Sequence, residues 1–263
     1  MAKKHLGQNF LNDRNMVDRL VRFVAPQLGQ HFVEIGPGQG ALTTALLPKI
    51  DQLDAIEIDP ELVDQLRIDL QSYPHCQLHQ ADAGKFKFDE LGDKLRLVGN
   101  LPYNLSTPLL FHFLQYATCF EDMHLMLQRE VVERACAPPG NKTYGRLSVM
   151  LQYHAQVTWL TKVPASCFNP RPQVESAFMR VVPYRIRPFE ATNERVFSQV
   201  VQKAFSQRRK TLRAIFKRHL TDTDWQKLDV DPRLRPECLT VEEFVRISNF
   251  ICYNTNKMLK FEH

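Results

Sequence analysis

Four consecutive residues, Asn100-Leu101-Pro102-Tyr103, combine groups that could activate the amino group of an adenine base. That nitrogen is a poor nucleophile because its lone pair is delocalised into the ring. The Asn100 side-chain oxygen and the Leu101 carbonyl could each accept one N–H, and Pro102 would hold Leu101 in the extended backbone that aims this carbonyl. Tyr103 offers an aromatic face on which the base could stack. The tetrapeptide therefore predicts methyl transfer to an adenine amine, with positioning rather than a strong base supplying the rate.

A lone Asn-x-Pro more often ends a strand in a capped turn, so residues earlier in the chain decide between the two interpretations. The run Glu34-Ile35-Gly36-Pro37-Gly38-Gln39-Gly40-Ala41 follows an apolar segment, and its glycines let the backbone approach a ligand closely. Glu57 lies 21 residues after Gly36, where a carboxylate could accept the hydroxyls of a ribose. Asp82 follows the third expected strand and could accept an adenine amino group. In this order the three features predict a nucleoside cofactor.

The glycine loop leaves the class of cofactor open, because the same letters satisfy G-x-G-x-x-A, which is typical of nicotinamide and flavin dinucleotide sites. Glu34 argues against a dinucleotide, since a negative charge is unfavourable beside a pyrophosphate. The loop suits a zwitterionic ligand that carries a sulfonium and an amino group. We therefore expect S-adenosylmethionine as the methyl donor.

A second aromatic wall for the base is predicted from Cys167-Phe168-Asn169-Pro170-Arg171-Pro172. The prolines stiffen this loop, and Phe168 could close over a flipped base opposite Tyr103. A phenylalanine in isolation is more often a core residue, so the alternative for Phe168 is simple burial.

The elements that must position these residues alternate between strands and helices. Short apolar runs separated by amphipathic stretches indicate βαβ units and a doubly wound, mostly parallel sheet, as in Rossmann-like α/β domains. Two later strands rich in β-branched residues would complete the sheet as an antiparallel pair. The expected strands are His31–Ile35, Leu53–Ile58, Gln77–Gln80, Leu95–Gly99, Met123–Leu127, Gln156–Lys162 and Ser176–Val182. The expected helices are Asn12–Val24, Ala41–Pro48, Pro60–Ser72 and Thr107–Tyr116.

The pattern becomes purely helical after Pro183 and Pro188, with a last helix expected over Val241–Ile251. We therefore expect a catalytic domain over residues 1–187 and a small all-helical domain over 188–263. Residues 185–220 contain ten Lys and Arg against two acids, whereas the whole chain has a net charge of +5. Such a segment fits a polyanionic partner such as nucleic acid, although charge alone fits a solvated helix face equally well. The candidate RNA-binding residues are Arg208, Arg209, Lys210 and Arg213.

Other features exclude several classes of protein. The basic start lacks the apolar stretch of a signal peptide, and no apolar run approaches the ~18 residues of a membrane span. The six cysteines are scattered without zinc-ligand spacing, which is typical of free thiols in a reducing cytoplasm. We expect a cytoplasmic monomer with no metal site and no membrane partner.

The ordered motifs resemble those of the bacterial small-subunit (16S) rRNA adenine dimethyltransferases, the family historically linked with kasugamycin resistance. The resemblance extends over nearly the whole chain, and its motifs are specific only in combination. The similar segments are 7–11, 33–43, 57–59, 80–83, 99–108, 126–131, 144–149, 168–177 and 205–212.

This resemblance implies a class I methyltransferase fold, and it implies that Asn9, Leu11, Gly36, Glu57, Asp82 and Asn100 line the cofactor site. For Asn9 and Leu11 it is the only indication, because composition alone would make them an N-terminal tail. It further implies a substrate, two adjacent adenosines in the loop of the 3′-terminal 16S rRNA helix, each methylated twice. The reaction would take place on the 30S subunit late in its assembly, and the helical C-terminal domain would help to dock that particle.

Other functions remain open at this level. The macrolide-resistance 23S rRNA adenine methyltransferases share the Asn-x-Pro-Tyr chemistry, but the 144–149 segment and the Arg208-Arg209-Lys210 run favour the small-subunit enzymes. The mitochondrial transcription-factor branch and the DNA adenine methyltransferases are more distant alternatives. A ribosome-assembly factor that acts mainly by binding would use the same basic helix and the same pocket.

Overall fold

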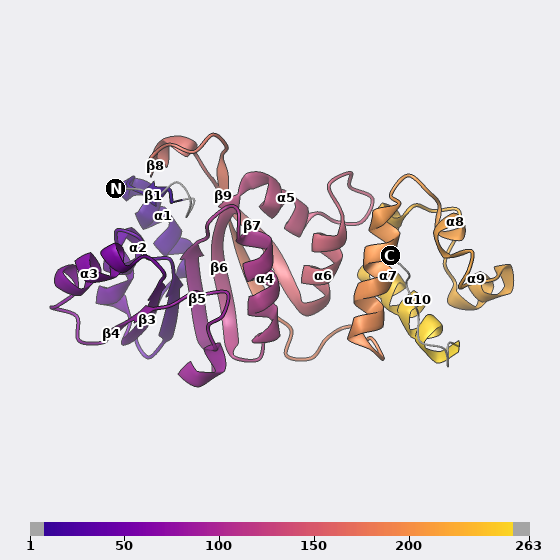
Figure 1. Cartoon of the computed structure of the whole chain (residues 1–263), viewed down its shortest axis with the longest axis horizontal. Coiled ribbons are helices and arrows are strands. Elements are labelled where there is room, and N and C mark those ends of the chain that lie inside the picture. The colour runs from indigo at the N-terminus through magenta and orange to yellow at the C-terminus, as the bar shows by residue number, and fades with distance from the viewer. Residues whose placement is uncertain (1–7, 255–263) are drawn as a thin grey trace. The chain divides into compact units, whose positions relative to one another are not determined.

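The computed structural model describes residues 8–254, so Gly7 of the similar segments lies outside the described residues. The chain divides into two compact units (Figure 1). The first consists of the residues up to 133 together with 156–183, and the second of 134–155 together with the residues from 184 onward. The units divide after residue 183, whereas the sequence predicts a domain boundary at 187. The 134–155 segment, however, belongs to the second unit, because helix α6 (Arg146–His154) packs with the C-terminal helices.

The first unit contains a seven-stranded sheet in the order β4-β3-β2-β5-β6-β9-β7. The five strands from β4 to β6 are parallel, and β9 runs antiparallel to β6, as the sequence predicts for a mostly parallel sheet. The bounds are β2 (His31–Ile35), β3 (Gln52–Glu57), β4 (Cys76–Gln80), β5 (Leu95–Asn100), β6 (Phe120–Gln128), β7 (Ala155–Val163) and β9 (Ser176–Pro183). Most residues of β2, β5 and β6 are buried, as expected for strands covered on both faces.

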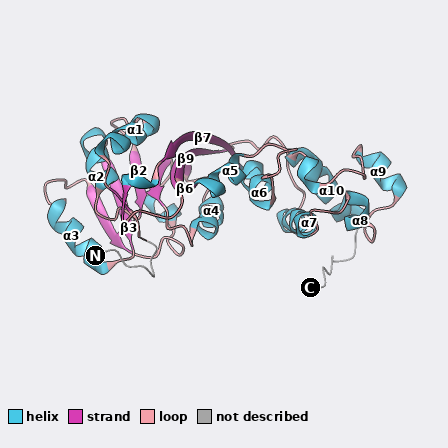
Figure 2. Ribbon diagram, turned by 90° about the horizontal axis from the view of Figure 1, so that it is seen from above, coloured by secondary structure: helices cyan, strands magenta, loops and turns pink. Residues whose placement is uncertain are grey.

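Helices cover the sheet on two sides because its winding reverses at β2. From β2 the chain proceeds through β3 to β4 in one direction, and from β5 to β6 in the other, so right-handed crossovers place α2 and α3 opposite α4 (Figure 2). On the first side, α1, α2 and α3 bury their apolar faces against Phe32, Leu53 and Val98 in one core cluster. The helices of this unit are α1 (Arg14–Val24), α2 (Ala41–Leu46), α3 (Pro60–Asp69), α4 (Ser106–Gln115) and the start of α5 (Arg129–Cys136).

Local signals set the ends of two of these helices. Asp13 caps α1 by accepting a hydrogen bond from the Met16 N–H at 2.8 Å. Asp59 caps α3 in the same way, by accepting from the Glu61 N–H. Pro60 follows as the first helical residue, a position where the N–H that proline lacks would have no partner within the helix. Strand β3 ends at Glu57 and helix α3 begins at Pro60. The end of β3 and the start of α3 therefore both lie at the carboxyl edge of the sheet.

One buried arginine ties α1 to the sheet. The guanidinium of Arg96 on β5 donates two hydrogen bonds of 2.9 Å to the Asp122 carboxylate on β6. It also donates to the Val24 carbonyl at the end of α1, at 2.8 Å, and to the Gln30 side chain. Arg96 and Asp122 are almost fully buried, so water cannot solvate their charges. The two charges compensate each other instead.

A two-stranded sheet that the sequence pattern does not indicate lies beside the main one. Strand β1 (Phe10–Leu11) pairs antiparallel with β8 (Phe168–Asn169), and the Asn12 N–H donates to the Cys167 carbonyl at 2.9 Å. A two-residue strand carries no periodicity, so only its partner 157 residues later in the sequence defines it.

The second unit is helical in the described residues. It contains the end of α5, α6 (Arg146–His154), α7 (Glu194–Ser206), α8 (Leu212–Phe216), α9 (Asp222–Leu228) and α10 (Val241–Asn254). Its core includes Tyr153, which stacks on Phe197 with ring centroids 4.4 Å apart, and Phe244, which packs against Phe205. Helices α5, α6 and α9 were not predicted individually, although the apolar residues Val131, Val132 and Ala135 of α5 do recur at helical spacing.

Candidate active site

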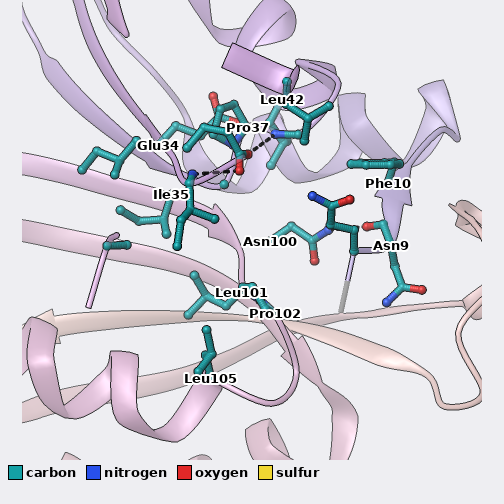
Figure 3. Close-up of a pocket in the computed structure, with 18 of the residues that line it drawn as sticks. Asn9, Phe10, Glu34, Ile35, Pro37, Leu42, Asn100, Leu101, Pro102 and Leu105 are labelled. Atoms are coloured by element: carbon teal, nitrogen blue, oxygen red, sulfur yellow. Dashed lines mark hydrogen bonds between the residues drawn. The ribbon is translucent and has the colours of Figure 1, made fainter. Parts of the chain in front are cut away.

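A cavity lies at the carboxyl ends of β2, β3, β4 and β5, where the winding of the sheet reverses (Figure 3). Open α/β sheets place ligands at such a switch point, because the loops after the two central strands diverge to opposite faces. The lining residues include every one predicted for the cofactor: Asn9, Leu11, Gly36, Gly38, Glu57, Asp82 and Asn100. The cavity also contains Leu101, Pro102 and Tyr103.

The glycine loop after β2 takes backbone conformations that require glycine. Gly36, Gly38 and Gly40 all have positive φ, at 64°, 59° and 78°. At Gly40 the loop passes into α2, and the Gly40 N–H donates to the Pro37 carbonyl at 2.8 Å. The loop thus turns sharply at the end of β2 and exposes its backbone to the cavity, as the sequence predicts.

The Glu57 carboxylate at the end of β3 is held by three backbone N–H groups. Oε1 accepts from Ile58 and Asp59, both at 2.9 Å, and Oε2 accepts from Gly38 at 3.2 Å. Burial raises the pKa of Glu57, while these hydrogen bonds oppose the rise. Glu57 therefore connects the glycine loop to the start of α3 and presents a fixed acceptor at the cavity wall.

The Glu34 carboxylate is buried without full compensation. Its side chain is 2% exposed, and Oε2 has no hydrogen-bond partner among the described residues. Burial raises the pKa of Glu34 to about 7, and the nearby Glu57 charge adds to the increase, whereas a contact with Thr43 opposes it. A buried acceptor of this kind beside a cavity favours a ligand with positive charge or N–H donors.

Asp82, after β4, has one carboxylate oxygen engaged in its own turn. Oδ1 accepts from the Gly84 N–H at 2.9 Å, and Oδ2 lies 3.9 Å from the Lys85 Nζ. The side chain is 41% exposed at the rim of the cavity. Asp82 thus shapes the turn that places it there and leaves Oδ2 in weak contact with a solvated lysine.

The Asn100 side chain is oriented by the N-terminal segment. Its Nδ2 donates to the Asn9 carbonyl at 2.9 Å, and Asn100 is the last residue of β5. Because the amide is planar, this bond turns Oδ1 away from Asn9. Figure 3 shows the two residues next to each other at the cavity. Asn100 therefore presents an acceptor of fixed direction.

The turn after β5 is closed by several hydrogen bonds. The Leu101 N–H donates to the Met126 carbonyl at 3.0 Å, which continues the parallel ladder with β6. The Pro102 carbonyl accepts from the Leu105 N–H at 3.0 Å and from the Ser106 hydroxyl at 3.1 Å. At its tip the Tyr103 hydroxyl is hydrogen-bonded to the Ser176 hydroxyl at 2.6 Å.

Residues 8–11 form a strap along the cavity. The Gln8 side-chain amide donates to Asp59 at 3.0 Å, the Asn9 carbonyl accepts from Asn100, and Phe10 packs against Gly38. The β1–β8 pairing fixes the other end of the strap at Leu11. No local sequence pattern reveals these contacts. The resemblance to the rRNA dimethyltransferases predicts cofactor roles for Asn9 and Leu11, but none of these contacts.

Phe168 does not line the cavity. Its side chain is 3% exposed and belongs to the core cluster that also contains Leu11, its partner in the β1–β8 ladder. The predicted aromatic wall opposite Tyr103 is therefore not formed in this structure, because the strand pairing buries the Phe168 ring. Its observed role is to hold β1, and with it the strap, against the core.

The four candidate RNA-binding residues differ in their surroundings. All four are exposed in the second unit. The Arg208 guanidinium donates to the Lys142 and Tyr144 carbonyls at 2.8 and 3.0 Å, and Arg213 pairs with Asp222 at 2.7 Å. None of the described ion pairs involves Arg209 or Lys210. Arg208 and Arg213 thus make contacts within their own unit, whereas no such ion pair is described for Arg209 or Lys210.

Two absences concern residues 8–254 alone. No group of three or more potential ligand side chains is placed to hold a metal ion there. None of the helices in that range is both long and apolar enough to cross a bilayer.

The family model described as "Ribosomal RNA adenine dimethylase" matches residues 1–252. The chain belongs to this family. Its curated relatives include proteins named ribosomal RNA small subunit methyltransferase A. The one from Chromohalobacter salexigens is 51% identical over 257 residues, which cover 95% of this chain and 91% of the relative. The one from Pseudomonas aeruginosa is 49% identical over 251 residues, 94% of each chain.

Solved structures agree with this membership of the rRNA adenine dimethylase family. A dimethyladenosine transferase from Plasmodium falciparum superposes with a TM-score of 0.80 at 26% identity, over 90% of this chain and 95% of that one. The 23S rRNA methyltransferase ErmE superposes with a TM-score of 0.76 over 93% of this chain and all of that one. At 23% identity, ErmE supports the class I methyltransferase fold only. Membership of a methyltransferase family implies a methyl donor of the S-adenosylmethionine type.

Proposed function

We propose that this rRNA adenine dimethylase transfers methyl groups from S-adenosylmethionine to N6 of two adjacent adenosines in the 3′-terminal hairpin loop of 16S rRNA, each modified twice. The substrate would be the 30S subunit late in its assembly in the cytoplasm, and the protein would act as a monomer. The curated relatives with about half of their residues identical carry the small-subunit name, which supports this substrate. The observation that carries the chemistry is the orientation of Asn100 by the Asn9 carbonyl.

The cavity fits the proposed cofactor in charge and in shape. The partnerless Oε2 of Glu34 is suited to the ammonium or the sulfonium end, and a fixed carboxylate at Glu57 is suited to ribose hydroxyls. The positive φ angles of Gly36 and Gly38 allow the backbone to approach the ligand closely. When bound, S-adenosylmethionine would supply an electrophilic methyl group on sulfur. The protein would supply the alignment.

Asn100 and Leu101 would hold the target amine. In the first transfer, Asn100 Oδ1 would accept one N6–H and the Leu101 carbonyl the other, so that the nitrogen lone pair leaves the ring and points along the line of attack. In the second transfer, the one remaining N6–H would bind to one of these two acceptors. Neither group needs to remove a proton before attack, because the N-methylated ammonium product is itself acidic. Fixing both acceptors before the substrate arrives lowers the entropic part of the barrier.

The large-subunit alternative is less well supported. Both kinds of enzyme share the fold and the Asn-x-Pro-Tyr turn, so the cavity does not separate them. The difference lies in similarity along the chain: about 50% identity to small-subunit enzymes against 23% to ErmE. We therefore place the target in the small-subunit rRNA.

The test is to incubate the protein and labelled S-adenosylmethionine with small subunits that lack these methyl groups, and to map the label. We expect two adjacent dimethyladenosines near the 3′ end of 16S rRNA, and no label on 23S rRNA. An Asn100→Ala variant should fold and bind the particle but lose methyl transfer by at least 100-fold, because one of two positioned acceptors is gone. Label on 23S rRNA, or normal turnover by Asn100→Ala, would contradict the proposal.

A further inference from the structure

The Tyr103 side chain is attached to the protein at both of its ends. Its backbone belongs to the turn that the Leu105 N–H closes on the Pro102 carbonyl, and its hydroxyl meets Ser176 Oγ at 2.6 Å. The residue is partly exposed and lines the cavity. A ring held only by its Cα could change rotamer, whereas a ring held also through its hydroxyl keeps its axis.

Ser176 is a rigid point of attachment. It is fully buried and lies on β9, where it pairs with Gln128 at the end of β6. The preceding residue, Glu175, accepts hydrogen bonds or ion pairs on both of its carboxylate oxygens, from Arg129 at 2.9 Å and from Lys162 at 2.6 Å. The Arg129 N–H also donates to the Glu175 carbonyl. The start of β9 is therefore fixed from three directions.

We infer that Ser176 is a positioning residue for methyl transfer, which acts by anchoring the Tyr103 hydroxyl so that the tyrosine ring stands ready to stack the target adenine. This inference rests on the proposed function, because it needs a base at Tyr103. Ser176 does not line the cavity and acts only through Tyr103. The sequence predicts two aromatic residues at the base, Tyr103 and Phe168. Of these two, Phe168 is buried in the core and Tyr103 lines the cavity.

The anchor has a clear energetic role. Stacking a flipped base requires the base to leave its neighbours, and a preset ring reduces the ordering that must accompany binding. A hydrogen bond between buried or half-buried hydroxyls contributes modestly, so its loss should change turnover by a factor rather than abolish it. The effect should concern the nucleobase side of the reaction and not the cofactor, because Gly36, Glu57 and Asp82 line the cavity and Ser176 does not.

The experiment is a double-mutant cycle of Ser176→Ala and Tyr103→Phe. Tyr103→Phe keeps the ring and removes the same hydrogen bond from the other side. Each single variant should lower kcat on under-methylated small subunits about 3- to 10-fold, with the Kd for S-adenosylmethionine within about twofold of wild type. The double variant should be no slower than the slower single variant, because the bond can be lost only once.

Thr161→Val is the matched control. Thr161 is a buried hydroxyl residue on β7 of the same unit and does not line the cavity. Its loss should lower the melting temperature about as much as Ser176→Ala does, with unchanged kcat. Tyr103→Phe changes a partly exposed residue and keeps its ring, so it tests the anchor even if Ser176→Ala does not fold.

Three outcomes would overturn the anchor: normal kcat in Tyr103→Phe, multiplying effects in the double variant, or a Ser176→Ala variant that loses cofactor affinity in step with kcat. The last pattern is that of a merely structural serine. If wild type itself transfers no methyl to small subunits, the proposed function fails and the inference fails with it. If wild type is active and Tyr103→Phe equals it, the inference alone fails.

Discussion

The Phe10 ring occupies the place where a side chain on Gly38 would begin. A Cβ atom at Gly38 would lie 2.9 Å from Phe10 Cδ1, inside normal contact distance. Gly38 belongs to the glycine loop and Phe10 to the strap, so this contact links two segments that both line the cavity. The strap also provides the Asn9 carbonyl that orients Asn100. A disturbance at Gly38 should therefore reach both the proposed cofactor site and the Asn100 amide.

Gly38→Ala should weaken S-adenosylmethionine binding by about tenfold or more. Alanine at a φ of 59° costs roughly 1 kcal/mol, and its methyl group would displace Phe10 from the loop. Isothermal titration calorimetry measures the affinity, and urea unfolding measures the backbone cost. Gly29→Ala is the control: it has a φ of 83° but nothing within 4 Å, so it should show the stability loss with normal affinity. Equal affinities for the two variants would refute the role of the Phe10–Gly38 contact.

Glu34→Gln should flatten the pH dependence of stability. The pKa of Glu34 is about 7 in the folded protein against an ordinary value of 4.5, so the folded state retains a proton that the unfolded state releases. The contribution of Glu34 to the free energy of unfolding is therefore greatest below pH 4.5. It falls as the pH rises from 4.5 to 7 and stays low above pH 7. Between pH 5 and 8 the wild type should lose about 2–3 kcal/mol that the glutamine variant keeps.

Denaturant unfolding at pH 5, 6, 7 and 8 would measure this difference. The exposed Glu90→Gln, which loses only a surface contact with Lys87, should follow the wild-type curve. Cofactor affinity should have the opposite trend in the wild type and rise through pH 7, because a cationic ligand prefers the ionised Glu34. A wild-type stability that is independent of pH over this range would show that Glu34 is ionised throughout.

Arg96→Lys should destabilise the first unit by about 2–4 kcal/mol although it preserves the charge. Lysine lacks the fork that donates twice to Asp122 and also reaches the Val24 carbonyl. The Asp122 carboxylate would then be buried with poorer compensation. The comparison is Arg67→Lys at an exposed pair with Asp64, which should change the unfolding free energy by less than about 0.5 kcal/mol. Similar losses at both positions would argue against this account of Arg96.

Reversing the charges of Arg209 and Lys210 to Glu should weaken binding to small subunits and flatten its salt dependence. Each lost phosphate contact lowers the slope of log K against log salt concentration by about 1. Filter binding between 50 and 200 mM salt measures both quantities. Arg213→Glu should reduce stability instead, because Arg213 pairs with Asp222. An unchanged salt slope in the double reversal would exclude these two residues from the RNA contact.

Most of the sheet and its ligand-binding edge were predictable from the sequence. The apolar runs of β2 to β6 and the glycines after β2 are local signals, and parallel strands necessarily bring their carboxyl ends to one edge. Glu57 and Asn100 end two of these strands and Asp82 follows a third, so the sheet topology brings all three to this edge. The predicted bounds of β2 agree with the structure, and those of the other strands differ by a few residues at their ends.

The partners of the site residues were decided by the tertiary structure. Strand β1 pairs with β8 over a separation that no periodicity encodes, and this pairing buries Phe168 and places Asn9 beside Asn100. Ser176 meets Tyr103, and Glu34 is left with a raised pKa, because burial and neighbours depend on packing between distant segments. The sequence by itself thus determined which chemical groups stand at the sheet edge, since strand ends are local features. Only the folded chain decided which of them are oriented, charged or hidden, because those properties arise from contacts across the core.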